Sequence, residues 1–124
     1  LTSYTAQMDI RRSVIADKKL LSLHGTTLNN DGTAINSGIT NGGTTGEFVD
    51  GATFSGLAGA GGIFLNSSAT GGTGMSGGIR IEIDATSTGY IPSGRHFYDL
   101  ELNSGSAVTR VLQGRFEVTG SVTR

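Results

Sequence analysis

The segments HFYDLEL (His96–Leu102) and VTRVLQGRFEV (Val108–Val118) decide the fold that this sequence predicts. In the first segment, Tyr98, Leu100 and Leu102 alternate with charged or polar residues, which is the period-two pattern of a strand with one buried face. The residues between the two segments are turn formers, so we expect a short loop that joins two strands. The pattern predicts a packed sheet and argues against a helical protein.

Four earlier segments also have the pattern or composition of strands. Residues 4–11 alternate with their even positions apolar, and residues 79–84 alternate in the same way through three isoleucines. Residues 19–24 form an apolar run of strand length, and residues 33–39 follow the hairpin signal Asn29–Gly32, whose Asp-Gly pair suits a tight turn. Residues 12–17 and 85–93 are interpreted as connections, the former as a turn or one helical turn.

Short strands that recur about every dozen residues are typical of an antiparallel sandwich or barrel. The predicted fold class is therefore all-β, as an antiparallel β-sandwich of immunoglobulin-like or related type. A chain of 124 residues is long enough for one such domain, so residues 1–124 are expected to form a single unit.

The window Gly38–Gly78 differs from the rest of the chain because it holds 14 of the 21 glycines and only two charged residues. Glycine weakens strands and helices, so long regular elements are not expected there. The window nevertheless carries large apolar residues, which a solvated linker rarely does. Such a window suits a long loop that packs against its own domain or against a neighbouring subunit, and we interpret it as a Gly-rich loop insertion that is able to bury apolar side chains against a partner. The candidate interface residues are Phe48, Val49, Phe54, Leu57, Ile63, Phe64 and Leu65.

Charge and composition exclude several classes of function. The formal net charge is -1, and no cluster of cations predicts a nucleic-acid partner. The chain has no cysteine, which excludes disulfides, thiolate catalysis and zinc held by cysteine. No apolar stretch approaches the ~20 residues of a membrane-spanning helix.

No residue pattern predicts a reactive centre, a cofactor site or a metal site. Residues 72–77 match G-x-G-x-x-G, but a glycine-rich loop precedes them and a strand follows, whereas a dinucleotide site needs a strand before and a helix after. His24 and His96 lack metal-ligand spacing. Asp99 and Glu101 share a strand face, as a glycosidase pair would, but this arrangement is more typical of a solvated surface. We therefore expect a protein that is not an enzyme and has no small-molecule substrate.

Three arginines near the end of the chain, Arg110, Arg115 and Arg124, have two interpretations. An arginine on an outer strand face can bind a carboxylate of a neighbouring subunit, because arginine is enriched at interfaces. It can equally pair with Glu101 or Glu117 across its own sheet for a fraction of a kcal/mol. The sequence leaves both open, and the three arginines join the candidate interface.

The opening segment TSYTAQMDIR (Thr2–Arg11), the segment FYDLEL (Phe97–Leu102) and the ending VTRVLQGRFEV with VTR at residues 122–124 also carry a resemblance. Together they resemble small β-sandwich structural proteins and domains of tailed bacteriophages and prophages. In that family a strand like LTGYTARMQIR opens the domain, YDLEL follows a turn, and an ending like RLLEGxVxVxxxVTR closes it. The resemblance covers both ends of the chain and omits the glycine-rich middle.

The resemblance implies a virion component without catalytic residues, at the tail, baseplate or fibre attachment region. Its expected partners are other virion proteins and copies of itself, in the phage particle and, during assembly, in the host cytoplasm. A capsid decoration protein that stabilises the shell is one alternative. A secreted carbohydrate-binding or adhesive sandwich is another, although the absence of tryptophan disfavours it.

Overall fold

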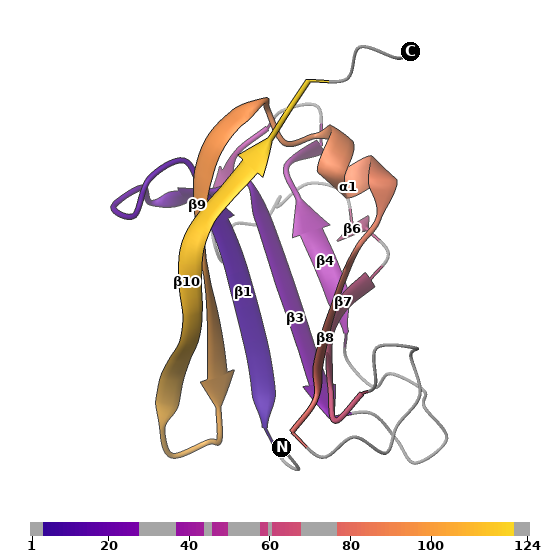
Figure 1. Cartoon of the computed structure of the whole chain (residues 1–124), viewed down its shortest axis with the longest axis vertical. Helices are drawn as coiled ribbons and strands as arrows, with labels where there is room; N and C mark the ends of the chain where they lie inside the picture. The colour runs from indigo at the N-terminus through magenta and orange to yellow at the C-terminus, as the bar shows by residue number, and fades with distance from the viewer. Residues whose placement is uncertain are drawn as a thin grey trace.

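The computed structural model describes residues 4–27, 37–43, 46–49, 58–59, 61–67 and 77–120. These residues form ten strands and one short helix (Figure 1). In chain order the elements are β1 (Thr5–Arg11), β2 (Lys18–Lys19), β3 (Leu21–Thr27), β4 (Gly38–Asn41), β5 (Phe48–Val49), β6 (Ala58–Gly59), β7 (Gly61–Leu65), β8 (Ile79–Ile83), α1 (Ala85–Gly89), β9 (Gly94–Asn103) and β10 (Val108–Val118).

The all-β prediction is confirmed. Eight of the described strands form one sheet in the order β10-β9-β1-β3-β4-β6, with β7 paired to β3 and β8 paired to β7. The sheet curls into a half-barrel, with β10 and β8 at its two sides and β1 and β3 between them (Figure 1). β2 and β5 make a separate two-stranded ribbon.

The prediction of a purely antiparallel sheet is wrong, because β3 and β7 are parallel. The other described pairs are antiparallel, and β1 lies between β9 and β3 with its register set by the alternating apolar residues. Met8, for example, lies opposite Leu100 on one side and Leu23 on the other. A shift of one residue would turn every apolar side chain of β1 to the opposite face, so this alternation fixes the register.

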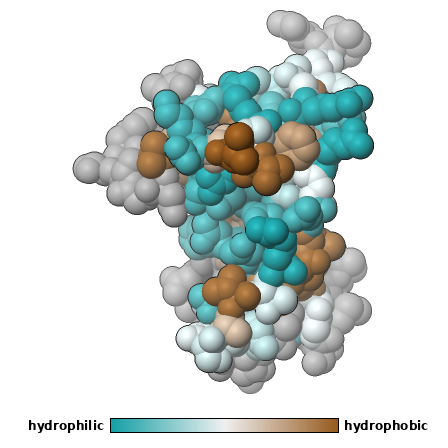
Figure 2. Space-filling view, turned by 90° about the vertical axis from the view of Figure 1, so that its left-hand side faces the viewer, coloured by the Kyte–Doolittle hydropathy of each residue, from teal (hydrophilic) through white to brown (hydrophobic). Residues whose placement is uncertain are grey.

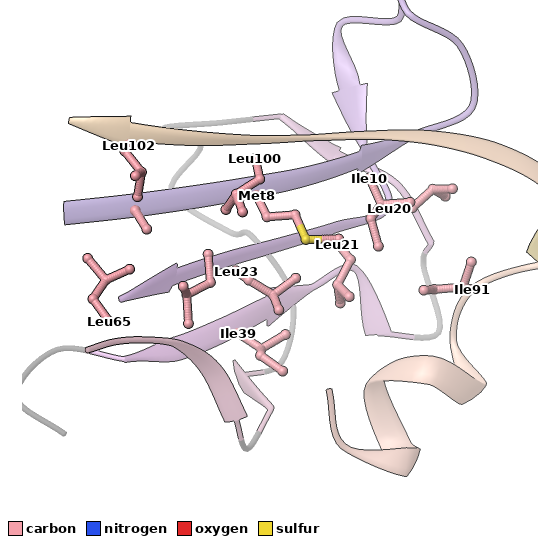
Figure 3. Packing of buried hydrophobic residues seen from close by; sticks show 12 residues of the cluster. Met8, Ile10, Leu20, Leu21, Leu23, Ile39, Leu65, Ile91, Leu100 and Leu102 are labelled. Carbon is pink, nitrogen blue, oxygen red and sulfur yellow. The ribbon is translucent and has the colours of Figure 1, made fainter. Parts of the chain in front are cut away.

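The core lies on the concave side of the curled sheet. Side chains from β1, β3, β4, β7 and β9 gather there in one cluster (Figure 3). Its buried members are Ala6, Met8, Ile10, Leu20, Leu21, Leu23, Ile39, Ile63, Leu65, Ile91, Leu100 and Leu102. The even-numbered residues of the opening strand and of β9 therefore face inward, as their alternation predicts.

The interpretation of Gly38–Gly78 as a loop insertion without long regular elements is refined by the structure, because part of this window forms strands of the main sheet. β4 and β7 lie within this window, belong to the main sheet and contribute Ile39, Ile63 and Leu65 to the core. Both strands are short, as the glycine content predicts. The sequence did not show that glycine here permits close backbone packing instead of a free loop.

Gly25 is the clearest case of such packing. A Cβ atom on this residue would lie 1.6 Å from the carbonyl oxygen of Ile63. Gly25 lies opposite the buried Ala6, so the Ile63 carbonyl occupies the inward side of β3. β7 can therefore approach β3 from the concave side only because residue 25 has no side chain. The first two residues of β7, Gly61 and Gly62, have φ values of +120° and +123°. Glycine adopts such positive φ values readily, so the backbone can enter β7 next to this contact.

Several local predictions are refined by the structure. The run 19–24 is divided, because Leu20 separates β2 from β3. Residues 12–17 form a turn in which the Ala16 amide donates to the Ser13 carbonyl at 3.2 Å. The connection after β8 contains α1, whose buried Ser87 accepts a hydrogen bond from the Asn41 side chain at 3.0 Å. The hairpin signal Asn29–Gly32 lies outside the described residues.

The contact at Gly25 predicts the effect of one substitution. We expect Gly25→Ala to lower the free energy of unfolding by about 3 kcal/mol, the upper end of overpacking costs, or to prevent folding. Backbone must move to admit the new methyl group, which is why the cost is high. Gly89→Ala is the matched control, because its Cβ would meet no atom within 4 Å. We expect it to raise the free energy of unfolding by ~0.5 kcal/mol. Urea denaturation measures both values, and equal effects would contradict the prediction.

Candidate functional site

A groove of the described surface lies between the β1–β2 loop and the outer face of β9 and β10. It encloses about 340 Å³. Eleven residues line it: Asp9, Arg11, Ser13, Val14, Phe97, Tyr98, Asp99, Arg110, Gln113, Gly114 and Arg115. Three arginines, two aspartates and two aromatic residues give it the size and mixed polarity of binding sites.

Asp9 organises the polar side of this groove. Its carboxylate accepts a hydrogen bond from the Ser22 hydroxyl at 2.7 Å and pairs with the Lys19 ammonium at 3.1 Å. The Lys19 side chain is only 2% exposed, so its charge needs a compensating anion nearby. Arg11 adds a third contact at 3.5 Å. Asp9 thus places a carboxylate beside the ammonium of a lysine that is buried beneath the groove.

Arg11 also fixes the β1–β2 loop. Its guanidinium donates to the carbonyl oxygens of Ala16 at 2.7 Å and Asp17 at 3.2 Å. The neighbouring Arg12 pairs with Glu47, which joins the loop to the residue before β5. The tip of the loop is therefore held in place by side chains at its base.

The loop tip exposes two adjacent apolar side chains. Val14 is 79% exposed and Ile15 is 91% exposed, the highest values among the large hydrophobic residues described. Large apolar side chains held out in solvent by a braced turn are typical of contact surfaces. The sequence carried a signal for this tip, namely two β-branched residues inside a turn, but the turn was interpreted only as a connection.

The outer face of β10 carries two of the predicted arginines. Arg110 pairs with Asp99 at 3.4 Å and donates to Gln113 at 3.1 Å. It does not pair with Glu101, although Glu101 lies directly opposite in register. Arg115 is exposed and makes no hydrogen bond or ion pair within the part of the chain that the structure describes. Of the three arginines of the groove, only Arg115 is without a partner there.

β10 is also an open edge of the sheet. Among the described strands it pairs only with β9, and it is 11 residues long. Val108, Val111 and Leu112 on this strand are exposed. On the side of the molecule that Figure 2 shows, separate hydrophobic patches stand within a hydrophilic surface. A long edge with exposed apolar side chains is a template for another strand.

The structure corrects part of the predicted interface. Ile63 and Leu65 are fully buried in the chain's own core, and Phe48 and Phe64 are buried as well. These four side chains are not available to a partner, because they fill space between elements of the same chain. Phe64 also packs beneath Arg80, whose guanidinium lies 4.2 Å from the ring centre. Val49 is exposed, and Phe54, Leu57 and Arg124 lie outside the described residues.

The two histidines weighed for chemistry lie on different strands, and Asp99 and Glu101 share one face of β9. His96 is buried, and its Nε2 is 2.7 Å from the Pro92 carbonyl oxygen, while His24 is exposed on β3. Asp99 faces Arg110. Of the sequence Gly72–Gly77, only Gly77 is described, and it precedes a strand. Within the described ranges, no group of three or more His, Asp or Glu side chains could hold a metal ion.

No family model, curated protein or solved structure matches this chain. None of the helices among the described residues has the length and apolar content to cross a membrane.

The burial of Lys19 predicts unequal roles for the two aspartates of the groove. We expect Asp9→Asn to lower the free energy of unfolding by about 3 kcal/mol, the lower end of the cost of breaking a buried ion pair, because it removes a carboxylate 3.1 Å from the buried Lys19 ammonium. Asp99→Asn is the matched control, since it breaks an exposed pair and should cost less than about 1 kcal/mol. Chemical denaturation at pH 7 measures both, and equal losses would show that Asp9 does not have this role.

Proposed function

We propose that this chain is a non-enzymatic structural protein of a tailed bacteriophage virion. It acts as an assembly module at the tail, baseplate or fibre attachment region, through contacts with other virion proteins and with copies of itself. The observation that carries the proposal is the long open edge of β10, with three exposed apolar side chains. Interfaces between permanent partners are built from such surfaces, which are costly to leave in solvent.

The segments that resemble the phage family support this proposal by their position. Residues 5–11, 97–102 and 108–118 belong to three strands that are neighbours in the sheet, in the order β10-β9-β1. Ile10, Tyr98 and Gly114 lie side by side in register across them. The resembling segments therefore make one continuous structural unit, which also carries the groove and the open edge.

The braced loop tip gives the module a second contact point. Val14 and Ile15 project from the β1–β2 loop beside the groove. Apolar side chains that are already ordered lose little conformational entropy when they enter a pocket of a partner. A module that works by contact needs this kind of preorganisation and needs no reactive group.

We also keep the β-sandwich as part of this proposal. In it, the curled sheet would be one of the two packed sheets. Capsid decoration remains the alternative position in the particle. Immunogold labelling of purified particles separates the two, because label at the tail supports the adaptor role and label over the shell supports decoration. Absence of the chain from particles, measured by mass spectrometry, would overturn both.

The loop tip generates a prediction for assembly. We expect the double substitution Val14→Ser with Ile15→Ser to reduce incorporation into particles by at least about tenfold, as loss of interface anchors does, with little change in the melting temperature. Both side chains are exposed, so the folded chain does not depend on them. Incorporation is measured by quantitative mass spectrometry of particles. The control is Ala85→Ser with Thr86→Ser on the exposed face of α1, and equal incorporation of both variants would exclude the tip as a contact.

A further inference from the structure

The geometry points to self-pairing of β10: we propose that two copies of this chain join antiparallel through β10, with Phe116 of each copy at the two-fold axis. This inference rests on the assembly role proposed above and names one of its partners, a second copy. Such a pair would extend the sheet from one half-barrel into the other and close both open edges of β10 at once.

A bulge limits which part of β10 can pair. The register with β9 shifts between Arg110 and Leu112, so the longest uninterrupted run of β10 is Leu112 to Val118, with three paired residues before the shift. A bulge at a sheet edge disturbs the row of backbone groups that another strand would need. The run Leu112–Val118, here called the regular part, therefore offers a second strand more backbone groups in one register than the three residues before the bulge do.

The charges of the regular part select one register. Its two charged residues are Arg115 and Glu117, which point to the outer face. An antiparallel pair centred on residue 115 would place two arginines opposite each other, and one centred on residue 117 would place two glutamates there. A pair centred on Phe116 places Arg115 of each copy opposite Glu117 of the other. This is the only centre in the segment that sets opposite charges against each other twice.

The present contacts of these residues fit that arrangement. Arg115 has no hydrogen-bond or ion-pair partner among the described residues. Glu117 pairs with Arg95 at 3.0 Å, yet its side chain is 56% exposed. A carboxylate accepts several hydrogen bonds, so Glu117 can hold Arg95 of its own copy and Arg115 of the second copy together.

Phe116 contributes on the opposite face of the sheet. It packs partly buried against the core cluster and lies opposite His96 in register. In a pair centred on Phe116, the two rings meet across the axis. Cross-strand aromatic pairs stabilise antiparallel sheets. The same register therefore forms charged pairs on the outer face of the sheet and an aromatic pair on its inner face.

Charge substitution tests the register directly. The full chain, Arg115→Glu, Glu117→Arg and the double variant with both changes are compared by sedimentation velocity over a range of concentrations. The original chain should form dimers. Each single variant should raise the dimer dissociation constant at least about tenfold, because two attractive pairs become two repulsive ones. Lys18→Glu is the control, since it makes the same change of charge as Arg115→Glu but on β2, away from β10, and should leave the dissociation constant unchanged.

Two recovery experiments separate this register from general effects of charge or folding. The double variant restores both opposite-charge pairs and should dimerise like the original chain. An equimolar mixture of the two single variants should form a heterodimer, because the acidic pair of the Arg115→Glu copy then faces the basic pair of the Glu117→Arg copy. Thermal unfolding checks that each variant folds. Failure of both recoveries in folded variants would overturn the proposed pairing.

A chain that stays monomeric at every concentration would also overturn the self-pairing. It would leave the assembly role standing, because a module can bind other virion proteins through Val14 and Ile15 without a second copy. Absence from particles, by contrast, would overturn the proposed function and would not affect dimerisation measured in solution. Each experiment can therefore contradict its own proposal without contradicting the other one.

Discussion

The close approach of β7 to Gly25 is the contact on which the rest of the architecture depends. The Ile63 carbonyl occupies the space where a side chain of residue 25 would lie, so β7 reaches the concave side of β3. From there β7 brings Ile63 and Leu65 into the core and pairs with β8 along its other edge. A flat sheet would leave these side chains in solvent. The half-barrel therefore exists because one backbone can touch another without an intervening Cβ.

The outer face is organised by a different constraint, the burial of a charge. Lys19 is nearly inaccessible, and Asp9 places a carboxylate 3.1 Å from its ammonium. Arg11 contacts the same carboxylate and also holds the loop that ends at Val14 and Ile15. The stability of the polar face and the position of the exposed apolar tip are thus linked through one carboxylate. On the neighbouring strands, Arg110 is satisfied by Asp99, which leaves Arg115 at the open edge of the sheet.

The candidate site was predictable only in part. Arg110 and Arg115 were expected on an outer strand face, and both lie there. They are five residues apart, so strict alternation would place them on opposite faces, and the bulge between Arg110 and Leu112 returns them to the same one. The apolar residues of the glycine-rich window were expected at an interface, yet Ile63, Phe64 and Leu65 are buried in the chain itself. The hydrophobicity of a side chain predicts that it will be buried, but it does not predict which surface will bury it. The exposed tip at Val14 was missed for the same reason.

The sequence alone determined the all-β class, the strands at both ends of the chain and the inward faces of β1 and β9. These properties are local, because backbone geometry sets the alternation of side chains within each strand. Only the tertiary structure decided that the sheet is mixed and curled, that the glycine-rich window supplies core strands, and that β10 is an open edge. Those properties depend on which distant segments meet. A glycine in the sequence looks the same whether its missing side chain makes room for solvent or for another strand.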